Sequence, residues 1–419
     1  MQVPAYHTVK QNPTLQELLN SAFPEPTFLL NIGHHNYILA IGKTDEFIYQ
    51  PTAKGQFSSQ FDDFISRTKG KYRFGFLSYE LKNEFESGLK SRNNDTIEFP
   101  LAHFIVPEYV FIVQDGAGFY FGKNPVEIRD ILKPRLDVEK SNSAIAIDGE
   151  TSKEEYLANI AKIKTNIQDG LAYELNYCIN FSGQGEIPSP EQLYKSLVEK
   201  TDAPFSAMLK LATHTVFSAS PERFISRRGN KLTCQPIKGT LKRGTNPEED
   251  KKLLSELASS EKDRSENIMI VDLVRNDLSK VSVAGSVVVE NLNEVKSFKT
   301  VHQLVSTLTS ELRPNVSESE VIQALFPMGS MTGAPKVSVM KFCDEIENFR
   351  RGLYSGAIGF IQPNGDFDFN VVIRTILHNT KTKRVSVAVG GAITMKSEAK
   401  KEYEECMTKL AALREVLEG

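Results

Sequence analysis

Short apolar runs separated by turn residues fill the first third of the chain. They lie at residues 28–30, 37–41, 74–77 and 109–113. Such alternation is typical of strands joined by loops. We therefore predict a β-rich region over residues 1–140. The polar stretch 137–150 is then a linker or an exposed crossing.

A helix pattern follows this stretch. Ser152 and Glu155 have the spacing of a capping box, and Gly170 is placed to end the helix. Between them apolar residues recur at the helical period, at Tyr156, Ile160, Ile163 and Ile167.

Residues 171–181 alternate and predict a strand. Its odd positions are apolar, and its polar groups, Glu174, Asn176 and Asn180, lie among the even positions. Two more strands, 215–227 and 231–238, flank the turn dipeptide Gly229-Asn230, which favours a hairpin.

Helices alternate with strands from there to the end of the chain. We predict helices over 260–280, from near Thr332, and over about 397–417. Antiparallel hairpins with peripheral helices favour an α+β fold over a doubly wound parallel sheet.

The hairpin carries the first candidate for chemistry. Its register would place Glu222 opposite Ile237 and diagonal to Lys238, near the end of the sheet. A partly desolvated amine beside a carboxylate can act as a nucleophile or base. The pair alone fits a surface salt bridge better, although the nearby Pro221 and Pro236 are unusual in a plain ladder.

Two helices carry pairs of acids. Asp263 and Glu266 are three residues apart on one helix, and Glu402 and Glu405 are three apart on the last, with Lys409 one turn further. Carboxylates from two helices could together bind Mg²⁺. From spacing alone, two solvated acidic faces are the simpler interpretation.

Two glycine-containing turns could bind an anion through backbone N–H groups. One spans residues 329–336, and the other is Gly390-Gly391-Ala392. Neither has the Walker A or dinucleotide spacing. Either could be a simple tight turn, and a lone His302 is more often structural than catalytic.

Composition narrows the class of protein. Lys plus Arg number 50 and Asp plus Glu 53, a net charge of −3 over 419 residues, which argues against general nucleic-acid or anionic-membrane binding. The four cysteines are far apart, there is no signal-peptide pattern, and no apolar run is long enough to cross a bilayer. We therefore expect a cytoplasmic enzyme.

Several long motifs in one order resemble the chorismate-utilising enzymes, which include anthranilate, aminodeoxychorismate, isochorismate and salicylate synthases. The matching stretches are 220–224, 236–240, 262–281, 326–340, 354–375 and 387–405. The resemblance implies a large two-layer antiparallel β-sheet sandwich flanked by helices. It also implies an N-terminal region, 1–140, like that of anthranilate synthase component I, interwoven with a chorismate-binding region, 150–419.

The third residue of the motif Pro-Ile-x-Gly-Thr separates branches of this family. Aminodeoxychorismate synthases have Lys there, as this chain has Lys238, whereas anthranilate synthases usually have Ala. The resemblance implies that Lys238 attacks the ring of chorismate while its C4 hydroxyl leaves, with Glu222 as general acid/base. Ammonia then displaces the lysine, giving 4-amino-4-deoxychorismate in 4-aminobenzoate and folate synthesis.

The resemblance also implies a set of ligands. Mg²⁺ would be bound by Glu266 and Glu405, supported by Asp263 and Glu402. The substrate would be bound by Arg374, Gly390, Gly391, Ala392, Lys409, Ser330, His302, Lys336 and Thr240.

Two further expectations concern nitrogen and the rival functions. Glu174 stands where the water-adding branch has Lys, which argues against isochorismate synthesis. None of the cysteines has the glycine-flanked setting of a glutaminase nucleophile. A separate glutamine amidotransferase subunit would then supply ammonia. The alternatives are anthranilate synthase component I and a non-catalytic chorismate-binding or regulatory subunit.

Overall fold

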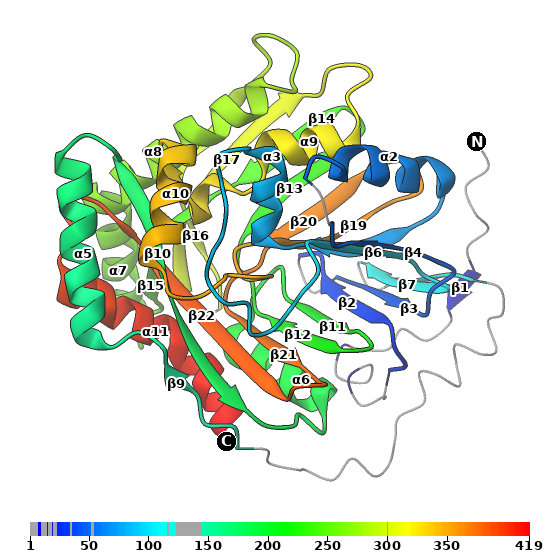
Figure 1. Ribbon diagram of the computed structural model, residues 1–419, viewed down its shortest axis with the longest axis horizontal. Coiled ribbons are helices and arrows are strands. Elements are labelled where there is room, and N and C mark those ends of the chain that lie inside the picture. Colours follow the sequence, from blue (N-terminus) through cyan, green and yellow to red (C-terminus); the bar gives the residue numbers. More distant parts are fainter. Residues whose placement is uncertain are drawn as a thin grey trace.

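The computed structural model describes residues 7–9, 15, 19, 23–33, 36–51, 54–114, 117–122, 144–299 and 301–419. It contains two large sheets with helices around them (Figure 1). The strand pairs are antiparallel throughout both sheets, so the predicted α+β fold with a two-layer antiparallel sandwich is confirmed. Among the described residues, no helix is long and apolar enough to cross a membrane.

The first sheet contains twelve described strands. In spatial order they are β1 (His7–Val9), β8 (Ala117–Phe121), β7 (Tyr109–Gln114), β3 (Tyr37–Ile41), β2 (Thr27–Asn31), β11 (Ala207–Lys210), β12 (His214–Ser218), β21 (Thr375–Asn379), β22 (Arg384–Ile393), β10 (Glu174–Gln184) and β18 (Gly333–Ala334), with β9 (Asp148–Gly149) beside β10.

The second sheet contains ten described strands. In spatial order they are β15 (Ile237–Lys242), β17 (Val301–Glu311), β14 (Lys231–Gln235), β13 (Arg223–Arg228), β20 (Phe367–Val371), β19 (Ala357–Ile361), β5 (Arg73–Leu77), β6 (Ala102–Val106) and β4 (Asp45–Tyr49), with β16 (Val288–Ser297) beside β17. Both sheets thus combine strands from the start of the chain with strands from its second half.

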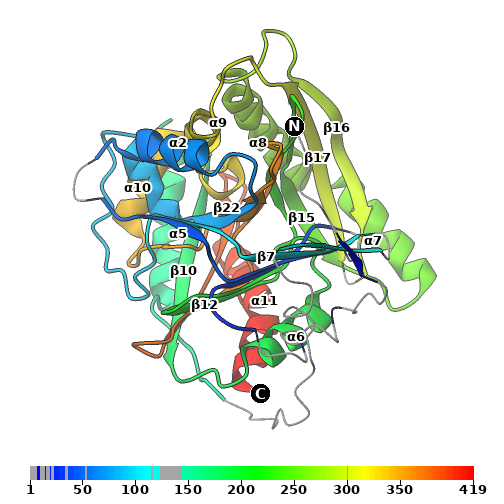
Figure 2. The same cartoon turned by 90° about the vertical axis from the view of Figure 1, so that its right-hand side faces the viewer.

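The helices pack outside the sandwich. They are α2 (Phe57–Arg67), α3 (Lys82–Phe85), α5 (Lys153–Gln168), α6 (Pro190–Thr201), α7 (Pro247–Ser259), α8 (Glu261–Ser279), α9 (Glu318–Leu325), α10 (Lys336–Ile346) and α11 (Ala399–Glu418), with 3₁₀ turns η1 (Tyr79–Leu81) and η2 (Gly329–Met331). In both views α2 and α9 lie at one end of the molecule, and α6 and α11 lie at the other (Figure 2).

Aromatic side chains hold these layers together. Phe28 of the first sheet packs on Phe74 of the second, with ring centres 6.2 Å apart. Phe104 points from the other face of the second sheet to Phe61 of α2, 5.0 Å away. Large aromatic rings bury much apolar area, and the layers are fixed by this burial.

The helical patterns predict their elements well. Ser152 and Ser260 cap α5 and α8, each accepting a backbone N–H three residues further on. The helix expected from near Thr332 begins four residues later, because Pro335 precedes it and the chain first forms η2 and β18.

Two strand predictions need correction. The stretch 215–227 is not one strand: the chain bends at Pro221 and passes from β12 in the first sheet to β13 in the second. β10 begins at Glu174, and Leu171 and Tyr173, predicted on its apolar face, are exposed. Its polar residues Glu174 and Asn176 are buried. Residues 137–143 of the predicted linker lie outside the described residues.

Candidate active site

The hairpin around Gly229 forms as predicted and brings Glu222 and Lys238 to neighbouring positions. A register shift places Arg223 opposite Gln235, so Glu222 lies outside the ladder and is not opposite Ile237. Glu222 occupies the bend between the two sheets, and Lys238 is the second residue of β15.

The direct partner of Lys238 is not Glu222. Its Nζ donates a 2.8 Å hydrogen bond to Oε1 of Glu174, which enters from the buried start of β10. Although burial favours the neutral amine, Glu174 and then Glu266 and Glu222 raise the pKa of Lys238. The side chain is 9% exposed, so the resting amine is a buried ammonium surrounded by carboxylates.

Glu222 is a buried acid. Burial raises the pKa of its carboxyl to about 7, against the opposing effects of Ser330, Lys238 and the Ile237 amide. The side chain of Ser330, from η2, is buried next to it. A carboxyl with a pKa near 7 can both donate and accept a proton at neutral pH.

The acids on α8 and α11 meet at the same place. Glu266 is buried, and its Oε1 has no hydrogen-bond partner among the described residues. Lys262 joins the two helices, donating a 2.7 Å hydrogen bond to Glu402 and lying 3.9 Å from Glu266 Oε1. Asp263 packs against Gly239, where a Cβ atom would lie only 2.8 Å from its carboxyl carbon.

The turn predicted at Gly390-Gly391-Ala392 is wrong, because these residues continue β22 and pair with β10. Gly391 faces α11. A Cβ atom on Gly391 would lie 3.8 Å from Nζ of Lys409, and 3.9 and 4.0 Å from carboxylate oxygens of Glu402 and Glu405. Nζ of Lys409 donates to the Gly390 carbonyl at 2.8 Å and pairs with Glu405 at 2.7 Å. The backbone of Gly391 is therefore uncovered by any side chain of its own, next to the charged groups of Lys409 and Glu405.

Arg374 supplies a cation without a partner. Its guanidinium has no hydrogen bond or ion pair within the part of the chain that the structure describes. Burial lowers its pKa, against the effects of Tyr354 and Glu405. Ala392 follows Gly391 in β22 and pairs with Asn176 of β10. An Arg guanidinium is well suited to binding a carboxylate through paired hydrogen bonds.

His302 and Thr240 are engaged elsewhere. The ring nitrogens of His302 lie 2.7 Å from Ser297 Oγ and 3.0 Å from Asp250 Oδ1. Thr240 is exposed and accepts a long hydrogen bond from Gln303. These contacts show structural roles, and substrate binding by either residue stays a prediction.

Lys336 also has structural partners. Its Nζ bonds to the Asp277 carboxylate of α8 and donates to the carbonyl groups of Leu325 and Pro327. Burial lowers its pKa, which Asp277 opposes. Lys336 thus ties α10 to α8, and its contact with a substrate stays a prediction.

The sequence does not predict three interactions of the site: Glu174 with Lys238, Lys262 with Glu402, and Tyr354 with Arg374. In the sequence Glu174 is distinguished only by its difference from the water-adding branch, and Lys262 and Tyr354 are not assigned any role. The alternation along residues 171–181 does put Glu174 on one face with Asn176. However, its partner Lys238 lies on a strand of the other sheet, and no pattern near Glu174 in the sequence predicts that pairing.

The carboxylates also allow a test for a metal. Among the described residues no three His, Cys, Asp or Glu side chains form a ready-made cluster. Mg²⁺, however, commonly takes only one or two protein carboxylates and keeps several waters. The unpartnered oxygen of Glu266 and the Glu402 and Glu405 oxygens near Gly391 are of the right kind. These donors fit Mg²⁺.

Comparison with known proteins identifies the family. A family model described as chorismate binding enzyme matches residues 24–415. The chain belongs to this family. A protein named aminodeoxychorismate synthase component 1 from Bacillus subtilis is 33% identical over 362 residues, 82% of this chain and 76% of that protein. Its namesake from Escherichia coli is 39% identical over 64% of this chain and 58% of its own length.

Other relatives are longer. The chloroplastic aminodeoxychorismate synthase of Arabidopsis thaliana is 41% identical over 70% of this chain, but the match covers 32% of that protein. The chain therefore spans about a third of the length of such relatives.

Solved structures agree on the fold. Anthranilate synthase component I from Streptococcus pneumoniae has a TM-score of 0.78 at 24% identity, covering 90% of this chain and 92% of its own. The menaquinone-specific isochorismate synthase MenF of Escherichia coli has a TM-score of 0.76 at 15% identity, covering 99% of this chain and 95% of its own.

Proposed function

We propose that this chain aminates chorismate at C4 to give 4-amino-4-deoxychorismate, for 4-aminobenzoate and folate synthesis. One observation carries the proposal: Lys238, whose side chain is only 9% exposed, is paired with Glu174 and has Glu266 and Glu222 close enough to raise its pKa. The names of the relatives that share 33–42% of their aligned residues with it support the same reaction.

The first half of the reaction uses Lys238 as nucleophile. Its ammonium must lose a proton, and Glu174 at 2.8 Å is placed to accept it. The neutral amine forms a C–N bond to the ring, the electron pair shifts through the ring, and the C4–O bond breaks. Glu222, neutral below about pH 7, gives its proton to the departing hydroxyl, which leaves as water.

The second half reverses the roles. Ammonia forms a bond to C4, the bond between the ring and Lys238 breaks, and Glu222 takes the surplus proton from the new ammonium group. Glu174 returns its proton to the released amine of Lys238, which restores the resting ion pair. The sum is chorismate plus ammonia giving product plus water. Arg374, Lys409 and the backbone at Gly391 would hold the substrate carboxylates throughout.

Mg²⁺ would be held by Glu266 and Glu405, with Asp263 and Glu402 in support. When bound there, it would neutralise carboxylate charge on the substrate and help the hydroxyl leave.

Ammonia comes in this proposal from a separate glutamine amidotransferase subunit. A glutaminase needs an accessible thiolate, and the four cysteines, Cys178, Cys234, Cys343 and Cys406, are all buried. Burial also raises the pKa of each thiol. Purified chain should use ammonium salts far better than glutamine. Equal use of both would overturn the need for a partner.

The product tests the proposal. Chorismate, Mg²⁺ and ammonium should give 4-amino-4-deoxychorismate by chromatography and mass spectrometry. Anthranilate fluorescence as the main signal would instead establish an anthranilate synthase, and binding without turnover would establish a non-catalytic subunit. Without ammonium, the wild type should gain the mass of chorismate less water on the peptide containing Lys238.

Substitution of the nucleophile completes the test. Lys238→Ala should abolish the adduct and reduce amination by at least about a hundredfold. The control is Lys231→Ala, which removes an exposed lysine of the same hairpin whose ion pair is with Glu290. Unchanged turnover by Lys238→Ala would refute the nucleophilic role.

A further inference from the structure

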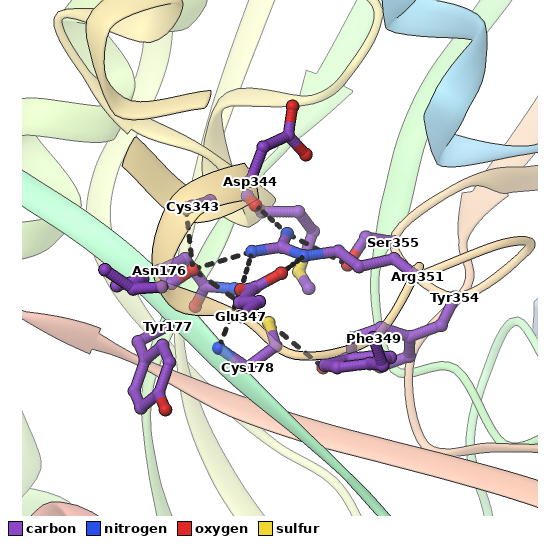
Figure 3. Close-up of polar contacts among 12 residues, drawn as sticks. Asn176, Tyr177, Cys178, Cys343, Asp344, Glu347, Phe349, Arg351, Tyr354 and Ser355 are labelled. Carbon is purple, nitrogen blue, oxygen red and sulfur yellow. Dashed lines mark hydrogen bonds and ion pairs between the residues drawn. The ribbon is translucent and has the colours of Figure 1, made fainter. Parts of the chain in front are cut away.

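A fully buried ion pair lies behind the site. The Arg351 side chain is 1% exposed and that of Glu347 is 4% exposed. Nε and Nη2 of Arg351 donate to the two carboxylate oxygens of Glu347, at 2.9 and 2.5 Å (Figure 3). Neither residue belongs to the proposed reaction, and neither reaches solvent.

The remaining donors of Arg351 join two separate segments. Nη1 donates to the Met331 carbonyl of η2 at 2.8 Å, and Nη2 donates to the Asn176 carbonyl of β10 at 2.9 Å. Oε1 of Glu347 accepts the backbone N–H of Cys178 at 3.0 Å. One charged pair therefore fixes η2 and β10 to the same point. Figure 3 shows the contacts to Asn176 and Cys178.

Both segments carry side chains of the site. Glu174, the partner of Lys238, is two residues before Asn176 on β10. Ser330, beside Glu222, directly precedes Met331. A shift of either segment would move a group that faces a reacting residue.

The energetics favour a geometric purpose. Removing two charges from water costs several kcal/mol per ion, and well-packed apolar side chains often stabilise a core as well as a buried ion pair does. A planar guanidinium, however, can bind several acceptors at fixed directions at once. Lysine keeps the charge but has one nitrogen, which cannot reach both Glu347 oxygens and both carbonyls in this geometry.

We propose that Arg351 and Glu347 are positioning residues that set the spacing between β10 and η2, and so hold Glu174 against Lys238 and Ser330 beside Glu222. The kinetic part of this inference rests on the proposed function. The structural part concerns the environment of Lys238 and stands without it.

The first test is Arg351→Lys, with Lys210→Arg as control. Lys210 also forms a largely buried ion pair, with Glu191, on β11 and α6. In Arg351→Lys we expect kcat for amination to fall about tenfold or more, with a smaller change in KM for chorismate. The charged groups that would bind the substrate carboxylates, on Arg374 and Lys409, form no hydrogen bond or ion pair with Arg351 or Glu347 among the described residues. The control should change neither constant.

A second measurement needs no turnover. At fixed pH 8, labelling of Lys238 by acetic anhydride, read by peptide mass spectrometry, should be several-fold faster in Arg351→Lys. The acids facing this amine are Glu174, Glu266 and Glu222. If Glu174 moves away, the hydrogen bond that holds the Lys238 amine is weakened, and the amine can react with the anhydride. Faster labelling in a chain that does not aminate chorismate would keep the positioning role and refute the proposed function.

Glu347→Gln provides an independent variant. It can still accept the Cys178 N–H but loses the charge that holds Arg351. Slower turnover and faster labelling in either folded variant support the inference. A folded variant with wild-type kcat and wild-type labelling overturns it. Loss of the fold in both variants would make the pair merely structural and also overturns it.

Discussion

Burial of the Glu222 carboxyl should make stability depend on pH through this one group. Its pKa is raised from the ordinary 4.5 to about 7, so the folded chain holds a proton that the unfolded chain releases. The stabilisation given by this proton is complete below pH 4.5. It is lost as pH rises from there to about 7.

The size of the effect follows from the shift. About 2.5 pKa units correspond to roughly 3 kcal/mol when the folded carboxyl is fully ionised, at pH 8. At pH 5 the loss is only about 1 kcal/mol, because the unfolded carboxyl is only partly ionised there. Replacement by a neutral amide removes the dependence while keeping the shape.

The assay is urea unfolding of wild type and Glu222→Gln at pH 5 and pH 8. From pH 5 to pH 8 the wild type should lose about 2 kcal/mol of unfolding free energy through this group, and the variant should not. The unfolding free energy of the variant relative to the wild type should therefore rise by about 2 kcal/mol. Comparing two pH values cancels any effect of packing. Glu199→Gln, on the exposed surface of α6, should show no such change. Parallel pH curves for wild type and Glu222→Gln would refute the reasoning.

Three further outcomes are expected. Gly391→Ala should keep the wild-type melting temperature, since its Cβ atom would meet nothing nearer than 3.8 Å, but the added methyl group should raise KM for chorismate. Gly390→Ala should lower the melting temperature, because its Cβ atom would lie 2.6 Å from Cys178 Sγ. Equal melting temperatures for the two variants would contradict this. In Glu174→Gln the part of the pH profile where the rate rises as Lys238 loses its proton should move to lower pH, because the amine of Lys238 loses the strongest charge that raises its pKa; an unmoved profile would contradict this. Phe61→Ala should cost about 3–5 kcal/mol of stability in chemical unfolding, since this buried ring packs on four aromatic neighbours, and a cost below about 1 kcal/mol would show that α2 is not held by it.

Local pattern was enough for some of the elements. The helix over 261–279 and the hairpin turn at Gly229 follow from capping, period and turn chemistry, which act between near neighbours. Two predicted boundaries are wrong although a proline stands at each: the strand predicted over 215–227 breaks at Pro221, and the helix predicted from near Thr332 begins after Pro335. Apolar periodicity alone does not say when a strand changes sheets.

The site was predictable only in part. The family motifs indicate Lys238 and Glu222, but the pairing of Lys238 with Glu174 joins residues 64 positions apart on different sheets. The bridge of Lys262 between α8 and α11 joins residues 140 positions apart. Such contacts depend on how the layers stack, and no pattern along the chain encodes that distance.

The interleaving of the sheets sets the order in which the protein can be made. Early strands pair with strands that come much later in the chain. β5 pairs with β19, where Leu77 lies opposite Ala357, and β2 pairs with β11, where Leu30 lies opposite Ala207. A ribosome therefore extends the chain for hundreds of residues while the early strands still have open, apolar edges. Contacts so distant along the chain slow folding, and unpaired edges recruit other chains. We therefore expect an N-terminal fragment that ends before β19 to aggregate when it is expressed alone.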